Sequence, residues 1–486
     1  MATLHLPIDR NAGVPIYRQV YDGIRRAILE GRLRPGQRIP STRGLATDLG
    51  VSRLPVLSAY EQLLHEGYLV GRTGSGTFVS RDLPDDLLRA PAVERLTPAA
   101  RRTGSARQAP ALDQPLPSSW SLPVVPFQVG LPALDLFPRS AWAKLVARHV
   151  RAETADRLTY GDPAGLRGLR SAVAEHLRAA RAVRCHADQV LIVPGSQAAL
   201  RFGAAALLEP HDCVAIEEPG YFGAHRAFRS AGATLVPVPV DAEGLSVTAL
   251  SRRGGDIRLV YVTPSHQYPL GVTMSAARRF ALLEWAERHQ AWILEDDYDS
   301  EFRYVSRPVG ALQGMDAHER VIYIGTFSKA LFPAVRVGYV VVPPALWTGF
   351  LAARSAFDMF APTLYQRALA ELLQQGHFAR HLRRMRSAYL DRRNALLRGV
   401  ARHCGAGLRV HNSDAGLHVT ALLRETVDDT DVVARLGLRG IAALPLSTSY
   451  LGPTRKPGLL LGFACATPHR LLHATRVLGE VLGESV

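Results

Sequence analysis

The stretch TFSKALFPAVRVGY, residues 326–339, contains one of only three lysines in a chain that carries 55 arginines. A chain that prefers arginine this strongly is expected to keep lysine where a guanidinium will not serve. Lysine can lose its proton near neutral pH and attack a carbonyl as a free amine, which arginine cannot do. Lys329 is therefore the first candidate for a chemically active residue, and an exposed helix lysine without a role is the alternative.

Polar residues surround Lys329 in the sequence. Thr326 and Arg336 supply a hydroxyl and a guanidinium near a strand end, where the ligands of open α/β sheets bind. Upstream, the stretch WILEDDYDSEF, residues 292–302, ends a strand in acidic side chains. These carboxylates could pair with a basic ring nitrogen, bind magnesium or merely be solvated.

A second anion site is indicated further upstream. The apolar strand VLIVP, residues 190–194, is followed by Gly195, Ser196 and Gln197 and then by a helical pattern. Such a turn directs backbone N–H groups and the helix dipole at an anion, although a glycine there is common. An anion, a carbonyl that accepts an amine and a basic ring nitrogen are the three features of pyridoxal 5'-phosphate (PLP).

The region around these motifs has the pattern of an α/β domain. Short apolar runs alternate with helical segments, which is typical of a mostly parallel sheet covered by helices on both faces. The runs are residues 190–194, 214–217, 258–264, 292–296 and 321–325. We therefore expect a large α/β domain over residues 123–361, a smaller α+β domain over residues 362–486, and a Pro-, Ala-, Arg- and Ser-rich linker over residues 81–122.

Residues 12–80 have the pattern of a winged helix-turn-helix domain. An apolar stripe marks a first amphipathic helix and consists of Ile16, Val20, Ile24 and Ile28. Residues 41–50 and 52–67 form a helix, a tight turn and a second helix capped by Ser52, and residues 68–79 form a hairpin or wing. In this geometry the second helix enters the major groove of DNA.

Basic residues of this module are candidates for DNA contacts. Arg53 begins the second helix, and Arg43 and Arg72 can reach phosphates or base edges. Each arginine taken alone is more often a solvated surface residue, and only their joint pattern favours DNA. The net charge of +15 does not decide the question, because residues 1–80 contribute only +4 of it.

Residues 39–79, IPSTRGLATDLGVSRLPVLSAYEQLLHEGYLVGRTGSGTFV, closely resemble the winged helix-turn-helix of the GntR family of regulators. By position, the resemblance implies DNA contacts from Ser41, Arg43, Arg53, Gly74 and Gly76. One departure is that Leu54 and Pro55 stand where the family usually has a polar residue and a threonine. A proline is tolerated in the first turn of a helix, but the missing hydroxyl leaves the operator sequence open.

Residues 125–480 look like a fold-type I, class I aminotransferase domain. The resemblance implies that Lys329 forms a Schiff base with PLP, Asp296 pairs with the pyridine nitrogen, Tyr298 hydrogen-bonds the ring oxygen and Tyr221 stacks on the ring. It also assigns the phosphate to Ser196, Gln197, Thr326 and Arg336. We expect surrounding positive charge to lower the pKa of Lys329.

The same resemblance implies a homodimer, because Tyr160 matches a tyrosine that reaches the phosphate of the neighbouring subunit. A packed core aromatic is an equally good interpretation of Tyr160 and of Tyr221. Two positions depart from the aminotransferase pattern: Tyr268 replaces an asparagine, and Leu460 replaces the arginine that binds the substrate carboxylate. Turnover of ordinary amino acids should be weakened without that arginine. Arg226 is a possible substitute anion site for an effector, or a surface arginine.

Along nearly its full length the sequence resembles the MocR subfamily, in which a GntR-type domain is fused to an aminotransferase-like domain. The resemblance implies a PLP-dependent DNA-binding transcription regulator whose effector is PLP itself or its adduct with an amine, and which controls genes of vitamin B6 or of amine and amino-acid metabolism. One alternative is a functional aminotransferase with an autoregulatory DNA-binding module. Another is a DNA-binding or dimerisation protein with a vestigial cofactor site.

Composition sets further limits. A hydrophobic fraction of 47% and a charged fraction of 21% are those of a globular protein, and no apolar run approaches the ~20 residues of a membrane helix. The first residues do not read as a signal peptide, so we expect a cytoplasmic protein. The cysteines have no CxxC spacing, which argues against disulfides and a metal site and favours small core residues. They are Cys185, Cys213, Cys404 and Cys465.

Overall fold

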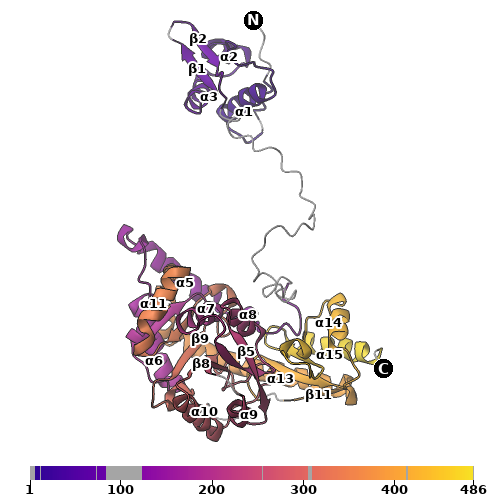
Figure 1. Ribbon diagram of the computed structural model, residues 1–486. Coiled ribbons are helices and arrows are strands. Elements are labelled where there is room, and N and C mark those ends of the chain that lie inside the picture. The colour runs from indigo at the N-terminus through magenta and orange to yellow at the C-terminus, as the bar shows by residue number, and fades with distance from the viewer. Residues whose placement is uncertain are drawn as a thin grey trace. The chain divides into compact units, whose positions relative to one another are not determined.

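A computed structural model describes residues 6–10, 12–72, 74–83, 123–253, 256–304, 309–411 and 414–484 (Figure 1). The chain forms two compact units, one at each end of the sequence. Most of the expected linker lies outside the described residues. The domain limits drawn from the sequence therefore stay predictions, and each unit is described by itself.

The N-terminal unit is a winged helix-turn-helix, as expected. Its elements are α1 (Ile16–Leu29), α2 (Thr42–Asp48), α3 (Arg53–His65), β1 (Leu69–Arg72) and β2 (Gly76–Val79), and the two strands pair antiparallel. The Oγ of Ser41 caps α2 by accepting a hydrogen bond of 3.1 Å from Gly44 N. Ser52 is the N-cap residue of α3, as predicted, although its side chain makes no capping hydrogen bond.

A small apolar core holds this unit together. Val20 and Ile24 of α1 are fully buried, as are Leu45 of α2 and Val56 and Leu63 of α3. Fully burying an aliphatic side chain stabilises a fold by about 1.5–3 kcal/mol. The apolar stripe predicted for the first helix is therefore the face that packs on α3.

The C-terminal unit contains an eight-stranded sheet in the order β3-β10-β9-β8-β7-β4-β5-β6. Strands β9, β8, β7, β4 and β5 are parallel neighbours, whereas β10 is antiparallel to β3 and β9 and β6 is antiparallel to β5. The strands are β3 (Val190–Val193), β4 (Cys213–Glu218), β5 (Thr234–Asp241), β6 (Gly244–Leu245), β7 (Ile257–Val262), β8 (Trp292–Asp297), β9 (Val321–Thr326) and β10 (Gly338–Val341). All five runs predicted from the sequence are strands, and β5, β6 and β10 were not predicted.

Helices cover both faces of this sheet. Along β3 successive side chains point to opposite faces, so Val190 and Ile192 join one apolar core while Leu191 and Val193 join another. The first core is shared with α6 and the second with α7. The helices of this part are α5 (Arg139–Arg151), α6 (Arg167–Arg181), α7 (Ser196–Leu207), α8 (Phe222–Ser230), α9 (Val247–Arg252), α10 (Ala276–Arg288), α11 (Trp347–Phe357) and α12 (Leu364–Gln374).

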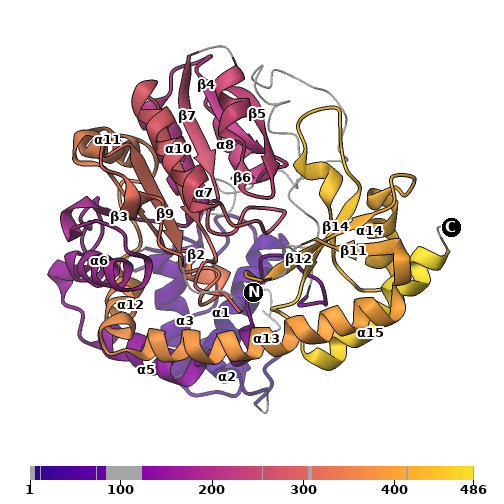
Figure 2. The same cartoon turned by 90° about the horizontal axis from the view of Figure 1, so that it is seen from below.

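The remainder of the unit is a second, antiparallel sheet with its own helices. Its strand order is β11-β12-β14-β13, formed by β11 (Leu408–Val410), β12 (His418–Leu423), β13 (Leu444–Pro445) and β14 (Gly458–Gly462). The long α13 (His377–His403) runs from the α12 end of the unit to this sheet and packs against α15 (Pro468–Gly483), beside α14 (Asp429–Leu438) (Figure 2). This is the mixed α+β region expected after the large sheet.

Two general expectations can be compared with the described residues. Cys185, Cys404 and Cys465 are buried, and burial raises the pKa of each thiol to about 11, whereas Cys213 is only partly buried. Throughout the ranges that the structure describes, the helices are too short or too polar to cross a membrane.

Candidate functional site

The candidate residues gather where parallel strands of the large sheet end. Asp296 lies near the carboxyl end of β8, and Thr326 is the last residue of its neighbour β9. Lys329 follows β9 by three residues, and Arg336 immediately precedes the segment that enters β10. Carboxyl ends of parallel strands meet at one edge of the sheet, so the fold brings together residues from separate stretches of sequence.

The amine of Lys329 is enclosed by protein. Its Nζ donates a hydrogen bond of 2.7 Å to the carbonyl oxygen of Gly130. Gly130 has φ of +77°, which favours glycine, and a Cβ there would lie 2.7 Å from Nζ and would displace the amine. Burial lowers the pKa of Lys329, while the charges of Asp299 and Asp296 raise it. Our expectation that positive charge lowers this pKa is wrong. Desolvation lowers it, and the two carboxylates oppose that shift.

Asp296 is a buried carboxylate with one free oxygen. Its Oδ2 accepts a hydrogen bond of 2.9 Å from the hydroxyl of Tyr261, and its Oδ1 has no protein partner. Burial raises the pKa of Asp296 to about 7. A buried carboxylate oxygen without a partner is costly, so this atom fits a donor from a ligand, such as a protonated ring nitrogen.

The other carboxylates of this stretch are used inside the protein. Asp297 accepts a hydrogen bond of 2.8 Å from Arg181 Nε, and the two oxygens of Glu295 accept from the backbone N–H groups of Leu312 and Gln313 at 2.8 Å each. Neither solvation nor magnesium coordination therefore accounts for the acidic stretch. Asp297 Oδ1 likewise has no hydrogen-bond partner, but Asp297 is already paired with the Arg181 guanidinium, so Asp296 is the better placed of the two to bind a basic ligand.

The raised pKa of Asp296 gives a stability prediction. We expect Asp296→Asn to stabilise the cofactor-free protein against unfolding at pH 8 and to do so much less at pH 4. Folded protein keeps the proton on Asp296 up to about pH 7, whereas the unfolded chain releases it near pH 4. Between these values wild-type folding takes up a proton, so wild-type stability falls as pH rises.

Asparagine carries no such proton. The difference between the two proteins in free energy of unfolding should therefore grow by on the order of 2–4 kcal/mol between pH 4 and pH 8. Urea unfolding of both proteins at several pH values between 4 and 8 measures it. A difference that stays constant with pH would contradict the buried, proton-holding state of Asp296.

The predicted anion site forms at the start of α7. Gly195 is its N-cap residue with φ of +90°, a left-handed conformation that favours glycine, and Ser196 and Gln197 lie in the first turn. A Cβ on Gly195 would lie 3.4 Å from Arg336 Nη1, so the guanidinium stands beside the helix N-terminus. The Oγ1 of Thr326 accepts a hydrogen bond of 3.2 Å from Ser328 N. Free N–H groups, the helix dipole and a guanidinium together favour a phosphate.

Tyr221 lies between this anion site and an aromatic group. Gln197 Nε2 donates a hydrogen bond of 3.2 Å to its hydroxyl, and its ring centroid is 5.4 Å from that of Tyr268. Burial raises the pKa of Tyr221 to about 12, and the nearby charge of Arg226 on α8 lowers it slightly. Arg226 itself is partly exposed. Tyr221 thus lies in the wall of the site, between Gln197 and Tyr268.

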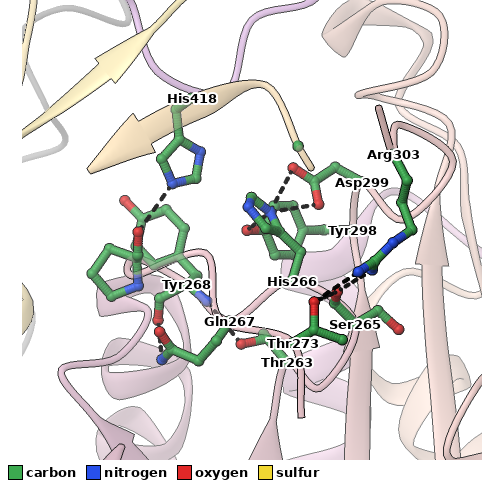
Figure 3. A network of polar contacts seen from close by, with 12 residues as sticks. Thr263, Ser265, His266, Gln267, Tyr268, Thr273, Tyr298, Asp299, Arg303 and His418 are labelled. Atoms are coloured by element: carbon green, nitrogen blue, oxygen red, sulfur yellow. Dashed lines mark hydrogen bonds and ion pairs between the residues drawn. The ribbon is translucent and has the colours of Figure 1, made fainter. Parts of the chain in front are cut away.

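Figure 3 shows a polar network around His266, and one of its members, Asp299, acts on the charge of Lys329. Sequence reasoning predicted Tyr298 as a site residue but missed His266 and Asp299. His266 Nδ1 lies 3.0 Å from Asp299 Oδ1 and 3.0 Å from the hydroxyl of Tyr298, and all three side chains point toward one another. His418 of β12 packs 5.4 Å from the His266 ring, and its Nε2 lies 3.2 Å from the carbonyl oxygen of Pro269. The motifs TPSHQYPLG and EDDYDSEF contain His266 and Asp299, but nothing in either motif shows that they pair.

Tyr160 does not reach the site of its own chain. Its side chain is 81% exposed, and its ring centroid lies 6.0 Å from that of Phe360. The interpretation of Tyr160 as a packed core aromatic is therefore wrong, because a core side chain would be buried.

The candidate DNA-contacting residues lie on exposed parts of the N-terminal unit. Arg53 Nε donates a hydrogen bond of 3.3 Å to Thr42 Oγ1, which links the starts of α3 and α2. The guanidinium of Arg72 lies 5.0 Å from the centre of the Phe78 ring on the hairpin. All six candidates are exposed: Ser41, Arg43, Arg53, Arg72, Gly74 and Gly76. Leu54 is 70% exposed at the first turn of α3, so an apolar side chain faces outward there.

Comparisons with known proteins agree with this architecture. Residues 16–79 match the family described as bacterial regulatory proteins, gntR family, and residues 123–474 match aminotransferase class I and II. The chain is 41% identical over 464 residues to the probable rhizopine catabolism regulatory protein MocR of Rhizobium meliloti, covering 95% of this chain and 93% of that protein. It is 34% identical to the pyridoxine biosynthesis transcriptional regulator PdxR of Corynebacterium glutamicum, with 94% of each chain covered.

A solved structure shows the same fold for the C-terminal unit. LysN, an α-aminoadipate aminotransferase from Thermus thermophilus solved with N-(5'-phosphopyridoxyl)-L-leucine, superimposes with a TM-score of 0.72 at 28% identity, covering 78% of this chain and 97% of that one. The fold class expected from the sequence is confirmed. The chain belongs to the MocR-type transcriptional regulators of the GntR family, which join a winged helix-turn-helix to an aminotransferase-like domain.

Proposed function

We propose that this regulator binds PLP in its aminotransferase-like domain and that PLP, or an amine held by it, changes how the dimer occupies operator DNA. The observation that carries the proposal is the free Oδ1 of buried Asp296, close to an amine whose pKa is lowered. Arg336 and the start of α7 add an anion site to the same sheet. These groups match the ring nitrogen, carbonyl and phosphate of PLP.

In this proposal each residue of the site has a role in binding PLP. Lys329 is the anchoring amine, Asp296 holds the ring nitrogen, Tyr298 donates to the ring oxygen and Tyr221 packs against the ring. The phosphate is held by Ser196, Gln197, Thr326 and Arg336. When bound, PLP supplies an electrophilic carbonyl that captures amines. Two similar proteins support this assignment: LysN was solved with a phosphopyridoxyl compound, and PdxR is a regulator of pyridoxine biosynthesis.

Burial explains why Lys329 is suited to this part. An amine with a lowered pKa is more often unprotonated at neutral pH and can attack a carbonyl. The 2.7 Å hydrogen bond to the Gly130 carbonyl holds Nζ in one place. The network of Asp299, His266 and Tyr298 fixes the tyrosine hydroxyl nearby at 3.0 Å from the imidazole. The chain thus orients both groups in the absence of ligand.

An exposed apolar surface supports a homodimer in which Tyr160 serves the partner's site. A Cβ on Gly161 would lie 2.8 Å from Thr363, so the segment around Tyr160 lies against the segment before α12. Large apolar side chains that are more than 40% exposed occur on both segments: Val150, Leu158, Tyr160, Phe357, Met359, Leu364 and Tyr365. Surfaces of this kind mark protein interfaces.

The N-terminal unit would bind double-stranded DNA in the cytoplasm through α3. Arg53 at the start of α3 and the arginines of α2 and the hairpin supply positive charge on an exposed surface. Helix-turn-helix proteins read the major groove with the first residues of the second helix. GntR-family regulators bind DNA in this way, and the match over residues 16–79 supports the same role here.

A functional aminotransferase is the second candidate, favoured by the intact Lys329 and Asp296 pair. The two functions predict opposite results for one purified protein. The regulator predicts that removal of PLP changes DNA affinity and that an L-amino acid with a 2-oxo acid gives no multiple turnover. Sustained turnover with DNA affinity independent of PLP would support the enzyme instead. Leu460, in place of a carboxylate-binding arginine, leads us to expect the first result.

A further inference from the structure

The outward face of α3 begins with an apolar side chain. Val56, Ala59 and Leu63 are fully buried in the core of the N-terminal unit and mark the inward face of the helix. With 3.6 residues per turn, Leu54 lies on the side of the helix opposite these three residues. Its side chain is 70% exposed, so it is the group that the first turn of α3 presents to the outside of the unit.

The first turn of α3 offers DNA a hydrocarbon surface next to one guanidinium. The side chains of Leu54 and Pro55 carry no hydrogen-bonding group, and a proline has no backbone N–H. Arg53, one residue earlier, is held to the start of α2 by the 3.3 Å hydrogen bond from its Nε to Thr42 Oγ1. Ser58, the next residue on the outward face, lies one helical turn further along. A base edge beside Leu54 would therefore meet an apolar group.

Thymine is the base whose major-groove edge suits such a group. All four bases present hydrogen-bond donors or acceptors in the major groove, and thymine alone adds a C5 methyl group. A leucine packed on a donor or an acceptor would displace its water without giving a hydrogen bond in return. Packed on the methyl group, the same leucine buries apolar surface of both partners. An exposed leucine at this position thus favours thymine over the other bases.

We infer that Leu54 selects a thymine of the operator by packing on its C5 methyl group in the major groove. The inference rests on the proposed binding of DNA through α3 and names a base that this helix reads. Successive Cα atoms are about 3.8 Å apart, and successive base pairs about 3.4 Å. The selected thymine should therefore lie close to the point that Arg53 contacts.

Uracil in place of thymine tests the contact, because uracil pairs with adenine in the same way but lacks the C5 methyl group. The probes are two fragments of the DNA upstream of the protein's own gene, one made with thymine and one with uracil throughout. Fluorescence anisotropy gives the Kd of the full-length protein for each fragment. We expect uracil to raise Kd about fourfold for each methyl group that Leu54 contacts. Equal Kd values would overturn the inference.

A matched pair of variants assigns the effect to Leu54. Leu54→Ala should bind the two fragments with similar Kd values, because the side chain that packs on the methyl group is removed. Leu64→Ala is the control, since Leu64 is also exposed, at 38%, but lies in the last turn of α3. This variant should keep the wild-type ratio of Kd values. A wild-type ratio in Leu54→Ala would show that another residue reads the methyl group and would overturn the inference.

The thymine fragment separates this inference from the proposed function. A wild type that does not bind this fragment would refute DNA binding and, with it, the inference. A wild type that binds both fragments equally well would refute the inference alone. Because Leu54 is exposed, its truncation should leave the fold intact, and single thymine-to-uracil changes provide a test that needs no variant. An effect spread evenly over all thymines, instead of confined to a few positions, would contradict selection by one side chain.

Discussion

Lys329→Ala is expected to leave the folded protein unable to retain PLP through dialysis, whereas the wild type retains it stoichiometrically. The variant loses the amine that anchors the cofactor, and the remaining contacts to ring and phosphate are noncovalent. The chain offers matched controls, because its other two lysines, Lys144 and Lys456, are exposed. Lys144→Ala and Lys456→Ala should retain PLP like the wild type in the same absorbance measurement.

Lys329→Arg separates charge from chemistry. Arginine keeps the positive charge between Asp296 and Asp299 but cannot act as a free amine near neutral pH. We expect it to lose retained PLP as alanine does. Retention of PLP by Lys329→Arg would mean that Lys329 holds the cofactor through its charge alone. Loss of PLP from Lys456→Ala would mean that another lysine is the anchor.

Arg53→Ala is expected to weaken operator binding by about 1–3 kcal/mol, which is a roughly 5- to 150-fold increase in Kd. Arg53 is exposed at the first turn of α3, the position from which a recognition helix reaches base edges. Fluorescence anisotropy with operator DNA at several salt concentrations measures the loss. A phosphate contact would also reduce the salt dependence by about one charge, whereas a base contact would change sequence preference.

Arg32→Ala is the matched control for Arg53→Ala. Arg32 is also exposed in the N-terminal unit, but it pairs with Glu30 at 2.7 Å after α1, away from α3 in the sequence. Its loss should change operator affinity by far less than that of Arg53. Equal losses for the two variants would show that the unit binds DNA through general charge and not through α3.

The chemical residues could be predicted because their types are rare or their motifs are specific. Lys329 stands out in an arginine-rich chain, Arg336 lies in the same stretch, residues 326–339, and Asp296 lies in the acidic stretch of residues 292–302. The partner of Lys329 could not be predicted, since Gly130 is 199 residues away and carries no side chain. The predicted cause of the lowered Lys329 pKa was also wrong. Burial is the cause, and burial depends on tertiary packing that a local motif does not show.

The strands of the large sheet could likewise be predicted only in part. The apolar runs of β3, β4, β7, β8 and β9 were predicted because buried parallel strands are continuously hydrophobic. Strand β5, TLVPVPVD, contains two prolines, which argue against a strand in a sequence. Strand β10, GYVV, is only four residues long, and its pairing between β3 and β9 is a tertiary property.

The dependence of DNA binding on PLP is measured by a footprint on the DNA upstream of the protein's own gene, with PLP removed and then titrated back. We expect PLP, alone or with a bound amine, to change occupancy or the protected pattern, and Lys329→Ala to abolish the change. The Lys456→Ala protein should respond like the wild type. A footprint that is the same with and without PLP and amine, in a protein shown to hold PLP, would contradict regulation of DNA binding by PLP.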